Sequence, residues 1–171
     1  SLHSPETQLA IATGLVALLG NHSIETQEHV TNLLLTLTSN KDNCSAVSRT
    51  AAIPRLATQL KNGSHKTQEL SAAVLARLAA ASDENVVLIA ESSSMRPLMS
   101  LLSSVSSLAQ SHIASILSHL ARISTSNKTF IVAEGGVAPL VAILGADEAT
   151  ETSPVKVASV SKWKKAALAN V

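Results

Sequence analysis

Leucine residues recur along the chain at an interval of about forty residues. The segments TGLVALLG, IPRLATQL, RPLMSLLS and APLVAILG align on leucines that are 41, 42 and 42 residues apart, namely Leu15, Leu56, Leu98 and Leu140. A second leucine in each segment keeps these intervals, at Leu19, Leu60, Leu102 and Leu144. A spacing kept this closely indicates an internal structural repeat.

Two further alignments have the same period. The segments TQEHVTNLLLTLT, TQELSAAVLARLA and AQSHIASILSHLA align Gln27 with Gln68 and Gln110, and Leu37 with Leu78 and Leu120. A third alignment joins Asn43, Asn85 and Asn127, each followed four residues later by Val47, Ile89 or Ile131. Three separate alignments with one period make a chance match a poor explanation.

Each repeat is predicted to contain three helices. The first is short, as in NKTFIVAE, and stops at a glycine or polar residue before a proline at Pro54, Pro97 or Pro139, where a fixed φ suits a first helical turn. The second is leucine-rich, as in PLVAIL. The third is longer and has apolar residues at helical spacing, for example Leu70, Val74, Leu75 and Leu78. One such unit cannot bury its own apolar faces, so stacking is expected, giving an all-α fold of the α-solenoid type.

The segment NKTFIVAEGGVAPLVAIL, residues 127–144, resembles the junction between consecutive units of the armadillo repeat family. The resemblance covers about Ala12 to Val171 and implies a single domain, a right-handed superhelix of about four repeats with truncated ends. The units fall near residues 1–50, 51–92, 93–134 and 135–171, with a loop inserted at 145–155, and the chain is expected to be part of a longer protein. The two-helix HEAT repeat is the competing interpretation, disfavoured by the separate short helix before each proline.

In armadillo proteins the third helices line a concave groove that holds an extended peptide or a partner helix. Carried onto this chain, the positions of the groove stripe with polar, charged or aromatic residues are His29, Asn32, Thr36, Arg77, His112, Ser115, His119, Trp163 and Asn170. Leu70, Ala73 and Ala166 occupy the other positions of the same stripe.

The residues on this stripe differ from two well-known armadillo grooves. Importins of the alpha type repeat a Trp and an Asn at two stripe positions, whereas this chain has Asn at the second position only at Asn170. A strongly basic groove similar to that of beta-catenin is also poorly matched, because Arg77 is the sole cation on the stripe. Arg77 is either an anchor for a carboxylate or phosphate or a solvated residue. Trp163 is either a binding anchor or a packing residue, and we favour packing.

Composition excludes several classes of function. Thirteen basic and 12 acidic side chains give a net charge of +1, so no strong overall field attracts nucleic acid or an anionic membrane. The longest apolar runs are far too short to span a bilayer. One cysteine, Cys44, cannot form an internal disulfide, which fits a reducing compartment, and a cytoplasmic location is expected, with a nuclear one also possible.

The sequence contains no recognisable catalytic or cofactor-binding constellation. His112 and His119 are seven residues apart on one helix, about 10 Å, which is too far for one metal ion. The serines near them have no acidic residue to orient an imidazole, and the Gly135–Gly136 pair follows a helix where a phosphate-binding loop follows a strand. We therefore predict no enzyme activity, no cofactor, no metal and no small-molecule substrate.

The predicted function is a protein-interaction scaffold that binds a peptide or helical segment of another protein in the groove. Two alternatives remain open. One is a structural subunit of a large assembly that makes contacts through its outer helices. The other is the substrate-recruiting arm of a ubiquitin ligase, because the units also resemble the armadillo region of plant-type U-box proteins. The partner and the oligomeric state cannot be predicted from the sequence.

Overall fold

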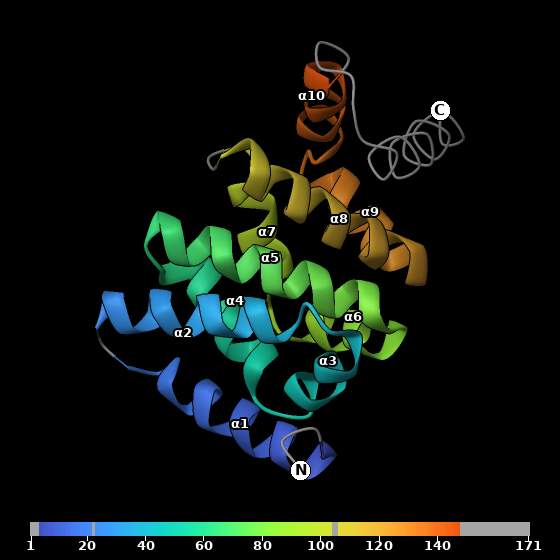
Figure 1. The fold of residues 1–171 in the computed structure, drawn as a ribbon. Helices are drawn as coiled ribbons and strands as arrows, with labels where there is room; N and C mark the ends of the chain where they lie inside the picture. Colours follow the sequence, from blue (N-terminus) through green and yellow to red (C-terminus); the bar gives the residue numbers. More distant parts are fainter. Residues whose placement is uncertain (1–3, 22, 104–105, 148–171) are drawn as a thin grey trace.

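The computed structural model describes residues 4–21, 23–103 and 106–147 (Figure 1). Among these residues it contains ten α-helices and no β-strand. The helices are α1 (Pro5–Leu18), α2 (Ile24–Leu37), α3 (Lys41–Ser48), α4 (Ala52–Asn62), α5 (His65–Ala81), α6 (Asp83–Glu91), α7 (Met95–Leu101), α8 (Ser107–Ile123), α9 (Thr125–Ala133) and α10 (Val137–Asp147). The all-α prediction is confirmed.

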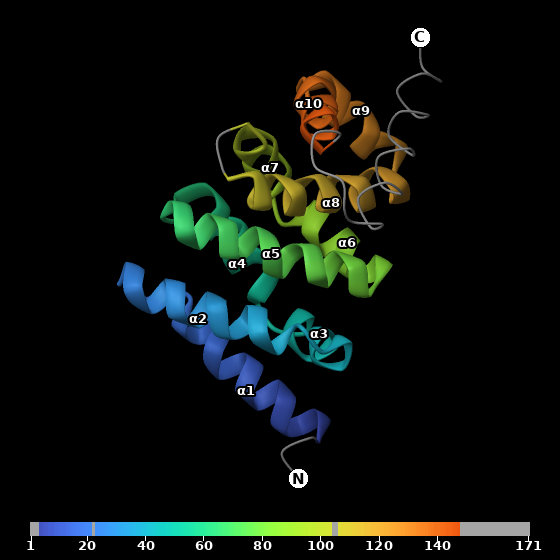
Figure 2. The ribbon, with the colours of Figure 1, turned by 45° about the horizontal axis from the view of Figure 1, so that its top comes forward.

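A short first helix and a middle helix precede each of the long helices α5 and α8, as the repeat predicted, and α7, the middle helix of the second triplet, has only 7 residues. Helices α3, α4 and α5 form one complete triplet and α6, α7 and α8 the next, while α1 and α2 precede them and α9 and α10 follow. The long helices α2, α5 and α8 lie side by side, with α5 packed between the other two (Figures 1 and 2). The predicted unit boundaries near 51, 93 and 135 fall between the short and the middle helix of each triplet.

Serine side chains start the long helices at equivalent positions of the repeat. Ser23, Ser64 and Ser106 are the N-cap residues of α2, α5 and α8, and each hydroxyl accepts a hydrogen bond from a backbone N–H of the first helical turn. Such caps satisfy donors that have no partner within the helix. Pro54 and Pro97 each lie in the first turn of a middle helix, where the missing N–H costs no helical hydrogen bond.

The aligned leucines form one continuous core. Leu56 and Leu98 are completely buried and Leu140 is 5% exposed. Val47, Ile89 and Ile131 of the short helices have no exposed surface. The equivalent residues therefore occupy equivalent environments in successive repeats. Because each repeat buries its apolar side chains against its neighbours, the stack rather than the single unit is the stable structure.

The repeated asparagines join the long helix of one triplet to the short helix of the next. The Nδ2 atoms of Asn43, Asn85 and Asn127 donate to the carbonyl oxygens of Leu37, Leu78 and Leu120, at 2.9, 2.9 and 3.0 Å. These carbonyls lie in the last turn of a helix, where the regular helical partner is missing. The third sequence alignment therefore marks a side-chain cap that turns the chain from one repeat into the next.

A left-handed residue follows the short helices α6 and α9 and offers a test of the repeat geometry. Gly135 has φ of 76° with no atom near an added Cβ, and Ser93, 42 residues earlier, has φ of 60°. Since a left-handed backbone costs a residue with a Cβ roughly 1 kcal/mol, Gly135→Ala is expected to lower the free energy of unfolding by about that amount. Ser93→Gly is expected to raise it slightly. Urea denaturation measures both changes, and effects of the same sign would contradict the prediction.

Some sequence predictions concern parts of the chain that the structure does not describe. Helix α10 ends at Asp147, inside the predicted insertion at 145–155, and the rest of that insertion lies outside the described residues. The predicted third helix of the last unit, with Trp163, Ala166 and Asn170, also lies outside them.

Candidate protein-binding face

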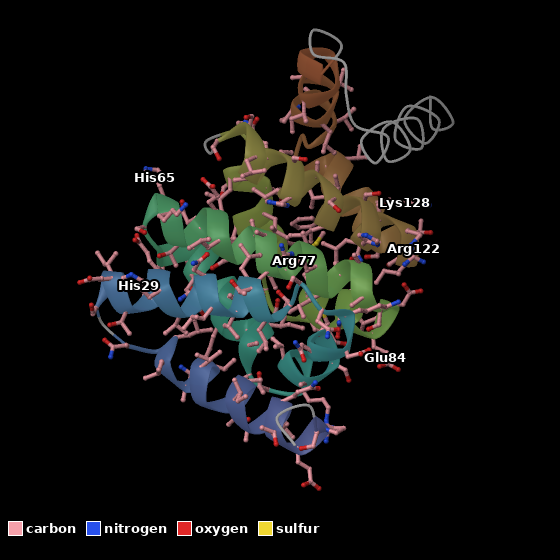
Figure 3. All side chains as sticks on the ribbon, in the orientation of Figure 1. His29, His65, Arg77, Glu84, Arg122 and Lys128 are labelled. Carbon is pink, nitrogen blue, oxygen red and sulfur yellow. The ribbon has the colours of Figure 1, made fainter. Side chains whose placement is uncertain are left out.

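The surface of the three long helices carries the residues of the predicted groove. We call the side chains that α2, α5 and α8 present to solvent the third-helix face. His29, Asn32 and Thr36 of α2 and Arg77 of α5 are exposed, and His112, Ser115 and His119 of α8 are half-buried. Figure 3 shows His29 on α2 and Arg77 on α5, the helix packed beside it. The structure therefore brings seven of the nine predicted site residues onto three adjacent helices, and Trp163 and Asn170 lie outside the described residues.

Two residues predicted on the same stripe are buried instead. Leu70 is 7% exposed and Ala73 is 5% exposed, so neither is available to a ligand. The reason is the position of α5, which packs against α2 on one side and α8 on the other. Among the described residues, α2 has a neighbouring long helix on one side only. Residues at the same helical angle on α2 are therefore covered by one long helix and not by two.

Polar contacts hold the long helices in register. The Ser64 hydroxyl donates to Glu28 Oε1 at 2.6 Å, and the Ser106 hydroxyl donates to Glu69 Oε2 at 3.0 Å. Each bond joins the start of one long helix to the long helix of the preceding repeat. Further along, Arg77 Nη1 donates to the carbonyl oxygen of Leu35 on α2. These contacts fix the spacing between the side chains of the third-helix face.

An ion pair lies at the C-terminal end of α8. The Arg122 guanidinium binds both carboxylate oxygens of Asp83, the first residue of α6, with an Nη1 to Oδ2 distance of 3.2 Å. The hydrogen bonds from Arg122 hold the pKa of the Asp83 carboxyl below its usual value, and the pKa of Arg122 is raised in turn. His119 contributes a smaller charge effect on Asp83. Both side chains are largely solvent-exposed, so the pair orients these two side chains but contributes little to the free energy of unfolding.

His112 is a half-buried residue of the third-helix face. Partial burial lowers the pKa of its imidazole below the usual 6.5, and the charge of Arg77 lowers it further, while Glu69 acts in the opposite direction. At neutral pH the ring is therefore uncharged, and it can both donate and accept a hydrogen bond.

The lowered pKa of His112 predicts a loss of stability in acid. As the pH falls through about 6.5, the unfolded chain binds a proton at this residue before the folded chain does, so the free energy of unfolding decreases. The slope is expected to stay below the ~1.4 kcal/mol per pH unit of one full proton, because the ring is only half-buried. Urea midpoints at pH 7.5 and 5.5 measure the change, and His112→Gln should reduce it. An equal change in the variant would contradict this assignment.

A hollow of about 330 Å³ lies beside the third-helix face. It is formed by the end of α2, the start of α3 and the end of α5, and its lining residues are Thr38, Ser39, Lys41, Cys44, Arg77, Ala80 and Ala81. The Cys44 side chain is 2% exposed, and burial raises the pKa of its thiol, an effect that the nearby charges of Arg77 and Lys41 partly offset. Sequence reasoning missed Lys41, because it lies on a short helix rather than on the third-helix stripe.

The described part of the chain gives no sign of a metal centre or a membrane segment. No group of three or more potential metal-ligating side chains comes together among these residues. None of the helices in the described ranges combines the length and apolar character that crossing a bilayer requires.

Comparison with known proteins defines the class of fold. An engineered protein from a structural genomics consortium is similar over 90% of this chain, with 27% identity and a TM-score of 0.69, and this chain spans only 59% of its length. A computationally designed armadillo repeat protein for modular peptide recognition is similar over 98% of this chain and 74% of its own length, with 21% identity and a TM-score of 0.70.

A further designed armadillo repeat protein was solved in complex with the peptide (KR)4. It is similar over 93% of this chain and 70% of its own length, with 19% identity and a TM-score of 0.68. No protein-family model matches the chain, and no curated protein matches it in sequence. The fold is that of an armadillo-type α-solenoid.

Proposed function

We propose that this protein is a non-enzymatic scaffold that binds a peptide or helical segment of a partner protein on the third-helix face. The observation that carries the proposal is a set of exposed or half-buried polar side chains on three adjacent long helices, above a closely packed apolar core. The ring of His112 and the amide of Asn32 offer donors and acceptors to a peptide backbone. The designed armadillo protein that was solved with a peptide supports the same use of the fold.

The proposal is tested by placing a large uncharged side chain on this face. Thr36 and Thr129 form a matched pair, because both are exposed on a helix and both donate to the carbonyl oxygen four residues earlier, at 3.0 and 3.1 Å. Thr36 lies on α2, whereas Thr129 lies on the short helix α9. Thr36→Trp is expected to weaken partner binding roughly tenfold or more by steric obstruction, and Thr129→Trp to leave it unchanged.

The measurement begins with affinity capture of partners from cell extract and mass spectrometry. The dissociation constant of each captured partner is then determined for the wild type and for both variants. If Thr36→Trp binds every partner as tightly as the wild type does, the third-helix face is not the binding surface.

A second candidate function is that of a structural subunit that makes contacts through its short helices. Val87 and Leu88 on α6 are 44% and 42% exposed, and Val132 on α9 is 55% exposed. A shallow hollow of about 310 Å³ adjoins Leu88 and includes Ile53. Exposed apolar side chains of this kind favour a protein contact. Loss of binding in Leu88→Asp, together with normal binding in Thr36→Trp, would support this second function over the first.

The narrower role of a substrate-recruiting arm in a ubiquitin ligase is a version of the same scaffold function. It is suggested by the resemblance of the repeat units to the armadillo region of plant-type U-box proteins. The sequence of the full-length polypeptide tests it directly, because this role requires a ubiquitin-ligase domain in the same chain or in a stable partner.

A further inference from the structure

The repeat provides an internal comparison for the hollow beside α5. Helices α3 and α6 begin at equivalent positions, with Lys41 in one repeat and Asp83 in the next. Near the ends of the long helices, Ala80 of α5 is equivalent to Arg122 of α8. The first repeat therefore has Lys41 and Ala80 at the two positions where the next repeat has Asp83 and Arg122.

In the second repeat, a carboxylate of the protein itself lies at the junction between the long helix and the short helix. Asp83 receives hydrogen bonds from both terminal nitrogens of Arg122. His119, at the position equivalent to Arg77, lies near enough for its charge to act on the same carboxyl group. The junction between a long helix and a short helix thus accommodates a carboxylate next to the guanidinium group of the long helix.

In the first repeat the cations come from other positions, because Lys41 takes the place of Asp83 and Ala80 takes the place of Arg122. Lys41 and Arg77 line the hollow, and none of its lining residues is acidic. Among the described residues, neither cation forms an ion pair. Arg77 donates through Nη1 to Leu35, which leaves the other nitrogens of its guanidinium for a ligand. With only the methyl group of Ala80 on this side, the hollow has room for one acidic side chain.

We propose that this hollow binds the carboxylate of a glutamate or aspartate side chain in an extended peptide of a partner protein. The carboxylate lies in the hollow between Lys41 and Arg77, the two cations that line it. Because Arg77 belongs to both the hollow and the third-helix face, the rest of the peptide runs along that face. The inference rests on the proposed function and adds the chemistry of the residue that is recognised.

The test uses three fluorescein-labelled peptides of eight residues, (Glu-Ser)4, (Gln-Ser)4 and (Lys-Ser)4, and fluorescence anisotropy. The wild type is expected to bind the glutamate peptide most tightly, and less tightly as the salt concentration rises. Lys41→Gln and Arg77→Gln are each expected to weaken this binding roughly fivefold to twentyfold, as for lost hydrogen bonds to a charged group. Lys128→Gln is the control, because Lys128 is exposed on α9, away from Arg77 (Figure 3).

A further variant introduces, at position 41, the residue that the next repeat has at the equivalent position. Lys41→Asp gives α3 the same first residue as α6, so it is expected to pair with Arg77 and abolish binding of the glutamate peptide. Circular dichroism and the urea midpoint show whether this variant keeps its fold. A folded Lys41→Asp protein that binds the glutamate peptide like the wild type overturns the proposal.

The remaining outcomes separate this inference from the proposed function. Unchanged binding of the glutamate peptide in Lys41→Gln and Arg77→Gln overturns the carboxylate site. A fourth probe is an eight-residue peptide with phosphoserine in place of glutamate, and its binding, when the glutamate peptide fails to bind, also overturns the carboxylate site. If another peptide binds and Thr36→Trp abolishes that binding, the scaffold function stands and the acidic specificity is wrong. If no peptide or captured partner binds in a Thr36-dependent way, both are wrong.

Discussion

Replacing Leu34 by alanine is expected to lower the free energy of unfolding by about 3 kcal/mol. Leu34 of α2 has no exposed surface and belongs to the continuous core, so the substitution leaves a cavity among fixed neighbours. Leu33, the preceding residue on the same helix, is 53% exposed. Leu33→Ala makes the same chemical change with the same change in helix propensity, and it is expected to cost less than about 1 kcal/mol.

Urea denaturation followed by circular dichroism measures both values. The effect of Leu34→Ala should also be local, because each repeat of a solenoid contacts only its neighbours. Hydrogen exchange is therefore expected to show the largest loss of protection in α1 and α2, with α8 and α9 nearly unchanged. Equal costs for the two variants would show that the described core does not extend to α2.

Replacing Asn85 by alanine is expected to cost about 2 kcal/mol. The Asn85 side chain is 4% exposed and donates to the Leu78 carbonyl oxygen at 2.9 Å. The backbone turns to an extended conformation at Ser82, with φ of −159° and ψ of 154°, so the side chain takes the place of the next helical N–H. The substitution leaves a carbonyl oxygen without its partner in a buried environment, and that costs more than a lost hydrogen bond in water.

Asn43→Ala is the matched control for this effect. Asn43 makes the same bond to Leu37 in the preceding repeat, but its side chain is only half-buried. The Leu37 carbonyl also accepts a bond from the backbone N–H of Asn40, at 3.4 Å. A cost below about 1 kcal/mol is therefore expected for Asn43→Ala, measured in the same urea titrations. A larger cost for Asn43 than for Asn85 would contradict the importance of burial at this cap.

The residues of the candidate site could be predicted from the sequence only where helical spacing within a repeat is enough to decide whether a side chain is exposed. The helical angle of His29, Asn32 and Thr36 follows from their spacing, and all three are exposed. The same reasoning placed Leu70 and Ala73 on the surface, and both are buried. Spacing gives the direction of a side chain, whereas its exposure depends on how closely the neighbouring helices approach.

The hollow between Lys41 and Arg77 could be predicted from residue spacing even less well. These residues are far apart in sequence and lie on two different helices of one triplet, α3 and α5, and nothing in the local pattern joins them. The useful signal was the comparison of equivalent positions, which shows a lysine where the next repeat has an aspartate. This difference between the two repeats can be interpreted only when the ion pair between Asp83 and Arg122 is known.

The sequence by itself determined the repeat period, the order of helices and the buried leucines, because a helix of fixed pitch must bury whichever stripe is apolar. Tertiary structure decided which polar residues are accessible and which charges meet. Those properties depend on contacts between helices such as α2, α5 and α8, whose separation is set by the packing of many side chains at once.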